Sequence, residues 1–205
     1  MVLLVVAQLV LPGIAEQQLR DRLSRSGTVE QVEISAFPAI ELLWDDADRV
    51  VVRMRNYHSG TAQLGSLLSE AGGVGSLDAS AGTLTAGLLT VHDAVLRKHG
   101  DRMTASAEVT ESDLRTAIPV LQSVVPVASG GGELTLRGTA TVLGVTASVD
   151  ATARAQNGQI VVTPDVPFGG LATISVFSNP AVEVQGLSAS PTPNGFRVAA
   201  VGRIR

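Results

Sequence analysis

Alternation of apolar and polar residues with a period of two is the feature that most limits how this chain can fold. In Arg49–Asn56, the residues Val50 and Val52 lie on one side of the repeat. Arg53 and Arg55 lie on the other side. Side chains of a β-strand point alternately to its two faces, so this spacing predicts a strand with one buried and one exposed face. The same pattern predicts further strands over Thr28–Ala36, Ser76–Thr85, Leu88–Lys98, Met103–Val109, Glu133–Val142, Gly144–Ala155, Gln159–Thr163, Ala172–Phe177, Ala181–Ser188 and Phe196–Ile204.

Short turn-forming sequences separate these strands. Asn157-Gly158, between two alternating segments, indicates a tight β-hairpin, because both residues tolerate the left-handed backbone of such a turn. His99-Gly100-Asp101 and Pro193-Asn194-Gly195 are also predicted turns. The glycine-rich segments 72–75 and 130–132 lack the lysine of a phosphate-binding loop, and we interpret them as flexible turns.

Three segments have the three- and four-residue spacing of helices. Ala15–Leu23 forms a short amphipathic stripe, and Thr61–Ala71 is a second predicted helix. Thr110 is the predicted N-cap of a third helix, which runs to Val125 and is kinked or divided by Pro119. The apolar positions of the second and third helices are Leu64, Leu67, Leu68, Leu114, Ile118, Leu121 and Val125.

The composition supports one strand-rich domain and excludes several functions. The chain has 205 residues, of which 45% are hydrophobic and 17% charged. No apolar run reaches the ~20 residues of a membrane-spanning helix. We therefore predict a single α+β domain over residues 12–205, with long antiparallel strands and two or three helices. The net charge of −4 argues against a nucleic-acid partner, which needs a basic face. The lack of cysteine excludes disulfides, thiol nucleophiles and cysteine-ligated metals.

The first eleven residues differ from the rest of the chain. Val2–Leu11 is apolar apart from Gln8, is stopped by Pro12-Gly13, and is too short to span a membrane. We interpret residues 1–11 as the remnant of a signal or membrane anchor whose true start lies upstream. A buried first strand or helical turn is the alternative interpretation.

The sequence lacks the common signatures of catalysis. It contains no H-E-x-x-H, G-x-S-x-G or G-x-x-x-x-G-K-[ST] motif. The three histidines are scattered, and on a strand His92 and Asp93 would point to opposite faces. The acidic cluster Asp45, Asp46 and Asp48 lacks the glycine and final glutamate of an EF-hand, so we interpret it as a solvated loop. We therefore predict no catalytic residue, no metal and no cofactor. An enzyme is the remaining alternative, and a cluster of His92 with a carboxylate and a serine in one cleft would favour it.

The remaining candidates for function are apolar. The two predicted helical stripes, Leu64–Leu68 and Leu114–Val125, either pack in a core or line a groove for an acyl chain. A chain rich in Val, Leu and Ala can bind an acyl chain by area alone, since each buried methylene contributes about 0.8 kcal/mol. Arg53 and Arg55 lie on one strand face, where they meet either anionic head groups or solvent.

Several short motifs resemble one family of lipid-binding proteins. They are Ala15–Leu23, Val32-x-Ile34-x-x-Phe37-Pro38-x-Ile40, Asp48-x-Val50-x-Val52, Ser112-Asp113-Leu114 and Gly195-Phe196-Arg197-Val198. In this order they resemble the LmeA-like phospholipid-binding family over nearly the whole chain, and the Phe37-Pro38 turn is the most specific motif. Ala39 departs from the pattern, because the family usually has a second bulky apolar residue after the proline.

The resemblance implies a fold similar to the BPI-like tubular lipid-binding proteins (TULIP), a half-barrel in which a strongly curved antiparallel sheet wraps against two or three helices. It also implies that an apolar groove binds a phospholipid or another acyl lipid, without catalytic residues. Members resemble secreted or membrane-anchored proteins of the actinobacterial cell envelope. We therefore expect a periplasmic location, contact with the membrane surface and a link to envelope glycolipid assembly. The alternative hypothesis is an envelope interaction or scaffold protein with a filled core and unknown protein partners.

Overall fold

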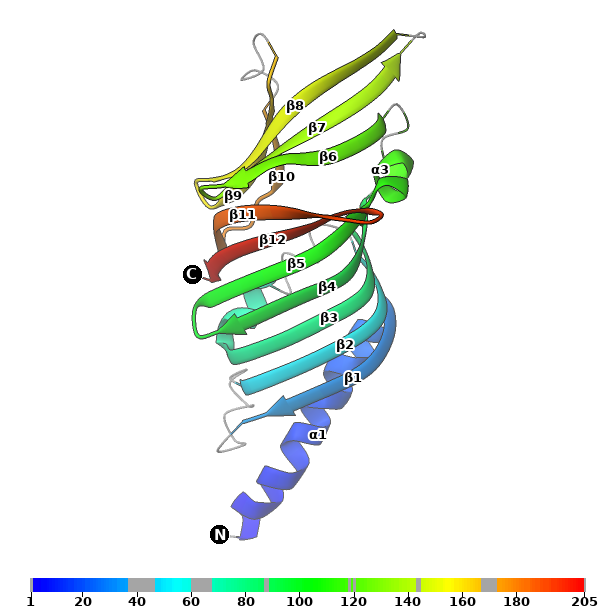
Figure 1. The fold of residues 1–205 in the computed structure, drawn as a ribbon. Coiled ribbons are helices and arrows are strands. Elements are labelled where there is room, and N and C mark those ends of the chain that lie inside the picture. The colour runs from blue at the N-terminus through cyan, green and yellow to red at the C-terminus, as the bar shows by residue number, and fades with distance from the viewer. Residues whose placement is uncertain are drawn as a thin grey trace.

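Two open, curved sheets contain most of the described residues (Figure 1). The computed structural model describes residues 2–36, 47–59, 68–86, 89–117, 119, 121–142, 145–166 and 173–204. The large sheet has the strand order β1-β2-β3-β4-β5-β12-β11, and the small sheet has the order β10-β9-β8-β7-β6. The prediction of a strand-rich fold with a curved sheet is confirmed, but the strands form two sheets where we expected one. The BPI-like half-barrel stays a prediction.

The strands of the large sheet are β1 (Gly27–Ser35), β2 (Ala47–Ser59), β3 (Val74–Ala86), β4 (Leu89–His99), β5 (Arg102–Thr110), β11 (Val182–Thr192) and β12 (Gly195–Ile204). Those of the small sheet are β6 (Leu121–Gly130), β7 (Glu133–Val142), β8 (Val145–Gln156), β9 (Gln159–Pro164) and β10 (Ile174–Phe177). Described helical structure occurs in α1 (Val2–Ser24), the 3-10 helix η2 (Ala71–Gly73), α3 (Glu111–Ala117) and at residues 68–70.

One face of the large sheet packs against α1. In β1, Val32 and Ile34 are buried, whereas Gln31 and Glu33 are exposed, as the alternating pattern predicted. We call the buried cluster beneath α1 the helix-side cluster, and it consists of Leu23, Val32, Ile34, Val50, Met54 and Tyr57. We call the face of the large sheet that carries this cluster the inner face, and the opposite face the outer face.

The helix α1 is longer than the sequence pattern predicted. It begins at Val2 and contains Pro12, where we expected a separate segment before a short helix from Ala15. The amide of Ile34 in β1 donates a hydrogen bond to Glu16 Oε1 at 3.0 Å, which fixes the position of α1 along β1. Among the described residues, no helix combines the length and the apolar character that a membrane crossing requires. The role of residues 1–11 as an anchor remnant stays a prediction.

The third predicted helix is wrong beyond Ala117, where α3 ends. The residues from Leu121 to Val125 belong instead to β6. Pro119 explains the break, because proline has no N–H to donate and disfavours helical backbone at the residue before it. The valine-rich sequence that follows suits a strand. Pro126 is tolerated there because β6 is an edge strand of the small sheet.

The strands β2 and β3 pair in parallel, and the other neighbours in both sheets pair antiparallel. Our expectation of a wholly antiparallel arrangement is therefore wrong at this pair. Parallel neighbours need a crossover connection instead of a hairpin. Residues 60–73 separate β2 from β3 in the sequence, which is long enough for such a crossover.

The two sheets meet where hairpin turns of the small sheet reach β11. The amide of Leu187 donates to the carbonyl of Gly132 at 3.0 Å, and that of Val184 donates to the carbonyl of Gly158 at 3.1 Å. Asn157 and Gly158 have φ values of 53° and 78°, as the predicted Asn-Gly turn requires. Buried residues from both sheets form what we call the intersheet cluster: Leu134, Ala153, Val182, Val184 and Leu187.

Replacing Leu23 with alanine is expected to lower the free energy of unfolding by about 2–5 kcal/mol, because it leaves a cavity beneath α1. Ile14 lies on the same helix but is 48% exposed. The matched control Ile14→Ala is expected to change the unfolding free energy by less than about 0.5 kcal/mol. Urea unfolding followed by circular dichroism measures both variants. Equal losses in the two variants would contradict the packing of α1 on the sheet.

Candidate binding surfaces on the large sheet

A band of small apolar side chains crosses the middle of the inner face. Ala79, Leu96, Ala105 and Ala200 are cross-strand neighbours on β3, β4, β5 and β12, and all four are half-buried. Cross-strand neighbours point to the same face, so the four side chains form one row. We call this row and its flanking residues the alanine band, which consists of Ala79, Ala81, Ala94, Leu96, Ala105, Ala107 and Ala200.

The helix-side cluster and the intersheet cluster lie on either side of the alanine band. Ala81 packs at the margin of the helix-side cluster, and Ala200 packs at the margin of the intersheet cluster. The band therefore lies between the two clusters, and its side chains are apolar and only half-buried.

The single lysine of the chain, Lys98, lies beside this band on the inner face. It is cross-strand neighbour to Leu77 of the helix-side margin and to Met103 of the intersheet margin. Lys98 is 6% exposed, and its ammonium group donates to the carbonyls of Val74 and Gly72, the latter at 3.4 Å. Burial lowers the pKa of Lys98, and the charge of Asp101 offsets this in part.

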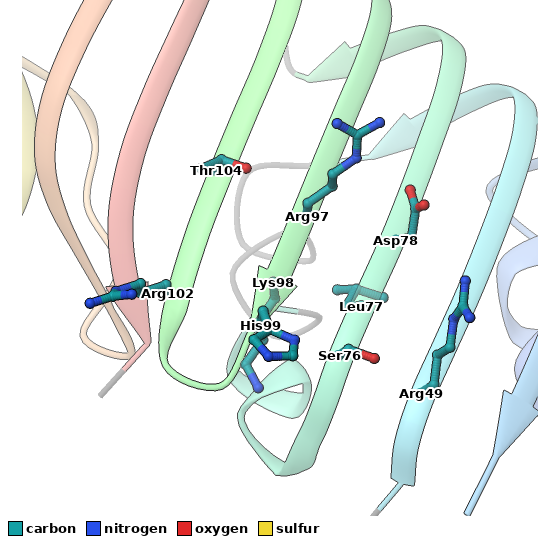
Figure 2. Close-up of a pocket in the computed structure, with 9 residues that line it drawn as sticks. All are labelled: Arg49, Ser76, Leu77, Asp78, Arg97, Lys98, His99, Arg102 and Thr104. Atoms are coloured by element: carbon teal, nitrogen blue, oxygen red, sulfur yellow. The ribbon is translucent and has the colours of Figure 1, made fainter.

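The outer face carries a hollow of about 400 Å³ at one end of the strands (Figure 2). Arg49, Arg97 and Arg102 line it from β2, β4 and β5, together with Asp78 of β3. Ser76, Leu77, Lys98, His99 and Thr104 are the other lining residues. The outer face is therefore polar and cationic at this end, in contrast to the apolar band on the inner face.

The predicted head-group residues Arg53 and Arg55 also lie on the outer face. Both are exposed and line a second hollow of about 350 Å³, together with Ser80 and Asp93. Arg55 Nε donates to Glu30 Oε1 at 3.1 Å. The sheet separates both arginines from the alanine band, so they cannot contact the head group of a lipid whose chains lie on that band. Their contact with head groups at the outer face stays a prediction.

The structure describes four of the seven predicted groove residues, Leu68, Leu114, Leu121 and Val125. Leu64, Leu67 and Ile118 lie outside the described residues. Leu68 packs at the margin of the intersheet cluster, and Leu114 packs against a third cluster, formed by Val109, Val124 and Phe196. Leu121 lies in β6, and Val125 of β6 is 45% exposed. Lipid contacts of Leu68 and Leu114 stay predictions, whereas the helical stripe that joined Leu114 to Val125 is wrong.

A histidine and a carboxylate meet between β4 and α3. His92 Nε2 and Asp113 Oδ2 are 2.9 Å apart, and Thr110 Oγ1 donates to the same carboxylate oxygen. The amide of Asp113 donates to Thr110 Oγ1 at 3.2 Å, which confirms the predicted N-cap. The hydroxyl groups of Ser112 and Thr110 are 2.8 Å apart. The network joins His92 of β4 to the first turn of α3, where Thr110 caps the helix.

No group of three or more His, Cys, Asp or Glu side chains in the part of the chain that the structure describes could hold a metal ion. Asp45 and Asp46 of the predicted acidic loop lie outside the described residues.

The two faces define a class of protein: a strand-rich domain with a half-buried apolar band on one face of a curved sheet and arginine-lined hollows on the other. The family model of LmeA-like phospholipid-binding proteins matches residues 4–200, so the chain belongs to this family. No curated protein and no solved structure matches the chain. The family resemblance inferred from the short motifs is thereby confirmed.

Lys98 gives a pH-dependent test of the inner face. The folded state holds the pKa of Lys98 below its ordinary value of 10.5, so the unfolded state binds more protons between the two values. The wild type is therefore expected to gain stability relative to Lys98→Met as the pH rises toward 10.5. Urea unfolding of both proteins from neutral pH upward measures this difference. Parallel pH profiles of the two proteins would show that Lys98 is not desolvated on the inner face.

Proposed function

We propose that this protein is a non-catalytic phospholipid-binding protein of the bacterial cell envelope, which holds acyl chains against the inner face of its large sheet. The observation that carries the proposal is the alanine band, an apolar surface that is only half-buried. Membership of the LmeA-like phospholipid-binding family supplies the class of ligand. The proposed location is the periplasmic side of the membrane, where such a carrier would supply lipid to glycolipid assembly.

The size of the band suits an acyl chain. It runs across β3, β4, β5 and β12, and neighbouring strands lie about 4.8 Å apart, so it is about 14 Å wide. Each methylene group buried against it contributes about 0.8 kcal/mol. An acyl chain needs no directed hydrogen bonds, which fits a surface made almost entirely of methyl groups.

Lys98 is the cation that a bound lipid would meet on the same face. Two carbonyl groups accept from its ammonium group, which has three N–H donors in total. None of the described carboxylates lies within ion-pair distance of it. A phosphate group at this position would therefore neutralise a buried charge. We propose that the head group lies toward Lys98 and the acyl chains lie along the alanine band.

The alternative function is an envelope scaffold with no lipid. Exposed valines on β6 and β12 favour it, since Val125, Val127 and Val201 are 45–49% exposed and apolar surface of this kind can contact another protein. The two functions differ in whether the purified protein carries lipid, because a scaffold does not require a ligand on its inner face.

Native mass spectrometry of the gently purified protein tests the choice. The lipid carrier is expected to show co-purified phospholipid, and Ala105→Phe is expected to abolish it, because the phenyl ring would fill the alanine band. Ser106 is the next residue and points to the outer face, so Ser106→Phe is a matched control that should keep its lipid. A clean apo mass for the wild type would favour the scaffold. Equal loss of lipid in both variants would remove the inner face as the site.

A further inference from the structure

Five cross-strand neighbours form a single row at one end of the outer face. Arg49 on β2 neighbours Ser76 on β3, which neighbours His99 on β4. His99 neighbours Arg102 on β5, and Arg102 neighbours Arg203 on β12. Four strand spacings of about 4.8 Å give the row a length of about 19 Å. Arg97 lies one position inward on β4, beside Thr104 and Asp78.

Three of these arginines lack an ionic partner. Among the described residues, no carboxylate lies within ion-pair distance of Arg49, Arg97 or Arg102. Carboxylates do pair with arginines elsewhere in the chain: Arg22 with Glu70, Arg55 with Glu30, Arg137 with Asp150, and Arg197 with Glu108. Within the part of the chain that the structure describes, this end of the sheet thus carries three arginines that form no ion pair.

The arrangement costs free energy when no anion is present. Arg102 and Arg203 are directly opposite each other on β5 and β12. Like charges in that position destabilise a sheet. Arg203 has Asp101 at 4.0 Å, whereas Arg102 forms no ion pair with a described carboxylate. An external anion between the strands would offset the remaining repulsion.

The apolar start of α1 projects from the same end of the molecule. Ile34, whose amide binds Glu16, lies next to Ser35, and Ser35 is the cross-strand neighbour of Arg49. The helix residues before Ala15 extend past β1, the edge strand of the large sheet next to β2 and Arg49 (Figure 1). At 1.5 Å per residue this projection is about 20 Å long. Its sequence from Val2 to Leu11 contains a single polar residue, Gln8.

We infer that this end of the large sheet docks on the surface of an anionic phospholipid bilayer, with Arg49, Arg97 and Arg102 against the phosphate groups and the start of α1 in the interface. A single phosphate could reach only part of a row about 19 Å long, whereas a lipid surface offers an array of phosphates at that scale. Basic residues combined with one apolar segment are the two signals that stable membrane attachment needs. The inference rests on the proposed function in one respect, that this surface is the source of the lipid.

Sedimentation with vesicles tests the inference on the full chain. The wild type is expected to bind vesicles of phosphatidylcholine mixed with phosphatidylglycerol, and to bind pure phosphatidylcholine vesicles much less. The triple variant Arg49→Ser, Arg97→Ser and Arg102→Ser is expected to bind the anionic vesicles about 100-fold more weakly, since each basic residue near such a surface contributes about fivefold.

The matched control removes the same charge elsewhere. Arg25, Arg115 and Arg154 are exposed and lie outside the row, so their triple replacement by serine should leave vesicle binding within about fivefold of the wild type. Equal losses in both triple variants would overturn the inference. Equal binding of the wild type to the two kinds of vesicle would also overturn it. So would binding of inorganic phosphate by a protein that binds neither kind of vesicle.

Native mass spectrometry of the same proteins separates this inference from the proposed function. The triple variant at the row should keep its co-purified lipid, because the inner face is unchanged. Vesicle binding without bound lipid would contradict the proposed function and keep the docking surface. Bound lipid with unchanged vesicle binding in the variant would keep the proposed function and contradict the docking surface.

Discussion

The register of the large sheet is the constraint on which the rest of the structure depends. Side chains alternate between the two faces, so a slip of β4 by one residue would exchange Leu96 for Arg97 and place a guanidinium group in the alanine band. Hydrogen bonds at the strand ends support the observed register. The amide of Gly100 donates to the carbonyl of Gly75 at 2.9 Å, and that of Ile204 donates to the carbonyl of Asp101 at 2.8 Å.

This register separates two chemistries across a single layer of backbone. Arg97 and Lys98 are adjacent in sequence, yet Arg97 is exposed on the outer face while Lys98 is buried beside the apolar band. A lipid with its chains on the inner face can meet Lys98 but none of the outer arginines. The outer arginines, and not Lys98, can contact an extended anionic surface such as a bilayer. Ligand binding and surface docking thus use different residues of the same strands.

Local sequence patterns were sufficient for the strands and several turns. The alternation in β1 and β2 and the Asn157-Gly158 turn depend on neighbours in sequence, which is why the patterns predicted them. The helix predicted beyond Ala117 failed because the spacing of Leu121 and Val125 also fits a strand, and Pro119 decides between the two. The parallel pairing of β2 with β3 depends on a crossover, which no local pattern records.

The candidate surfaces were harder to predict than the strands, for a physical reason. The residues predicted to line a groove, such as Leu67 and Ile118, have large apolar side chains. The alanine band consists mostly of small ones, and Ala105 with Ala107 was a weak signal of it in the sequence. The arginine row depends on register across five strands, so residues as distant as Arg49 and Arg203 become members of one surface only in the folded sheet.

The positions of the two proposed sites relative to each other give the bound lipid a direction. Lys98 is one residue from the end of β4, at the end of the sheet that carries the arginine row. Leu96 and the rest of the alanine band lie further from that end. A phospholipid with its phosphate at Lys98 would therefore keep its head group toward the docking surface, and its chains would lie on the alanine band, further from that surface. In this orientation, a lipid could enter or leave without its charged group crossing the apolar band, where desolvation of the phosphate would be most costly.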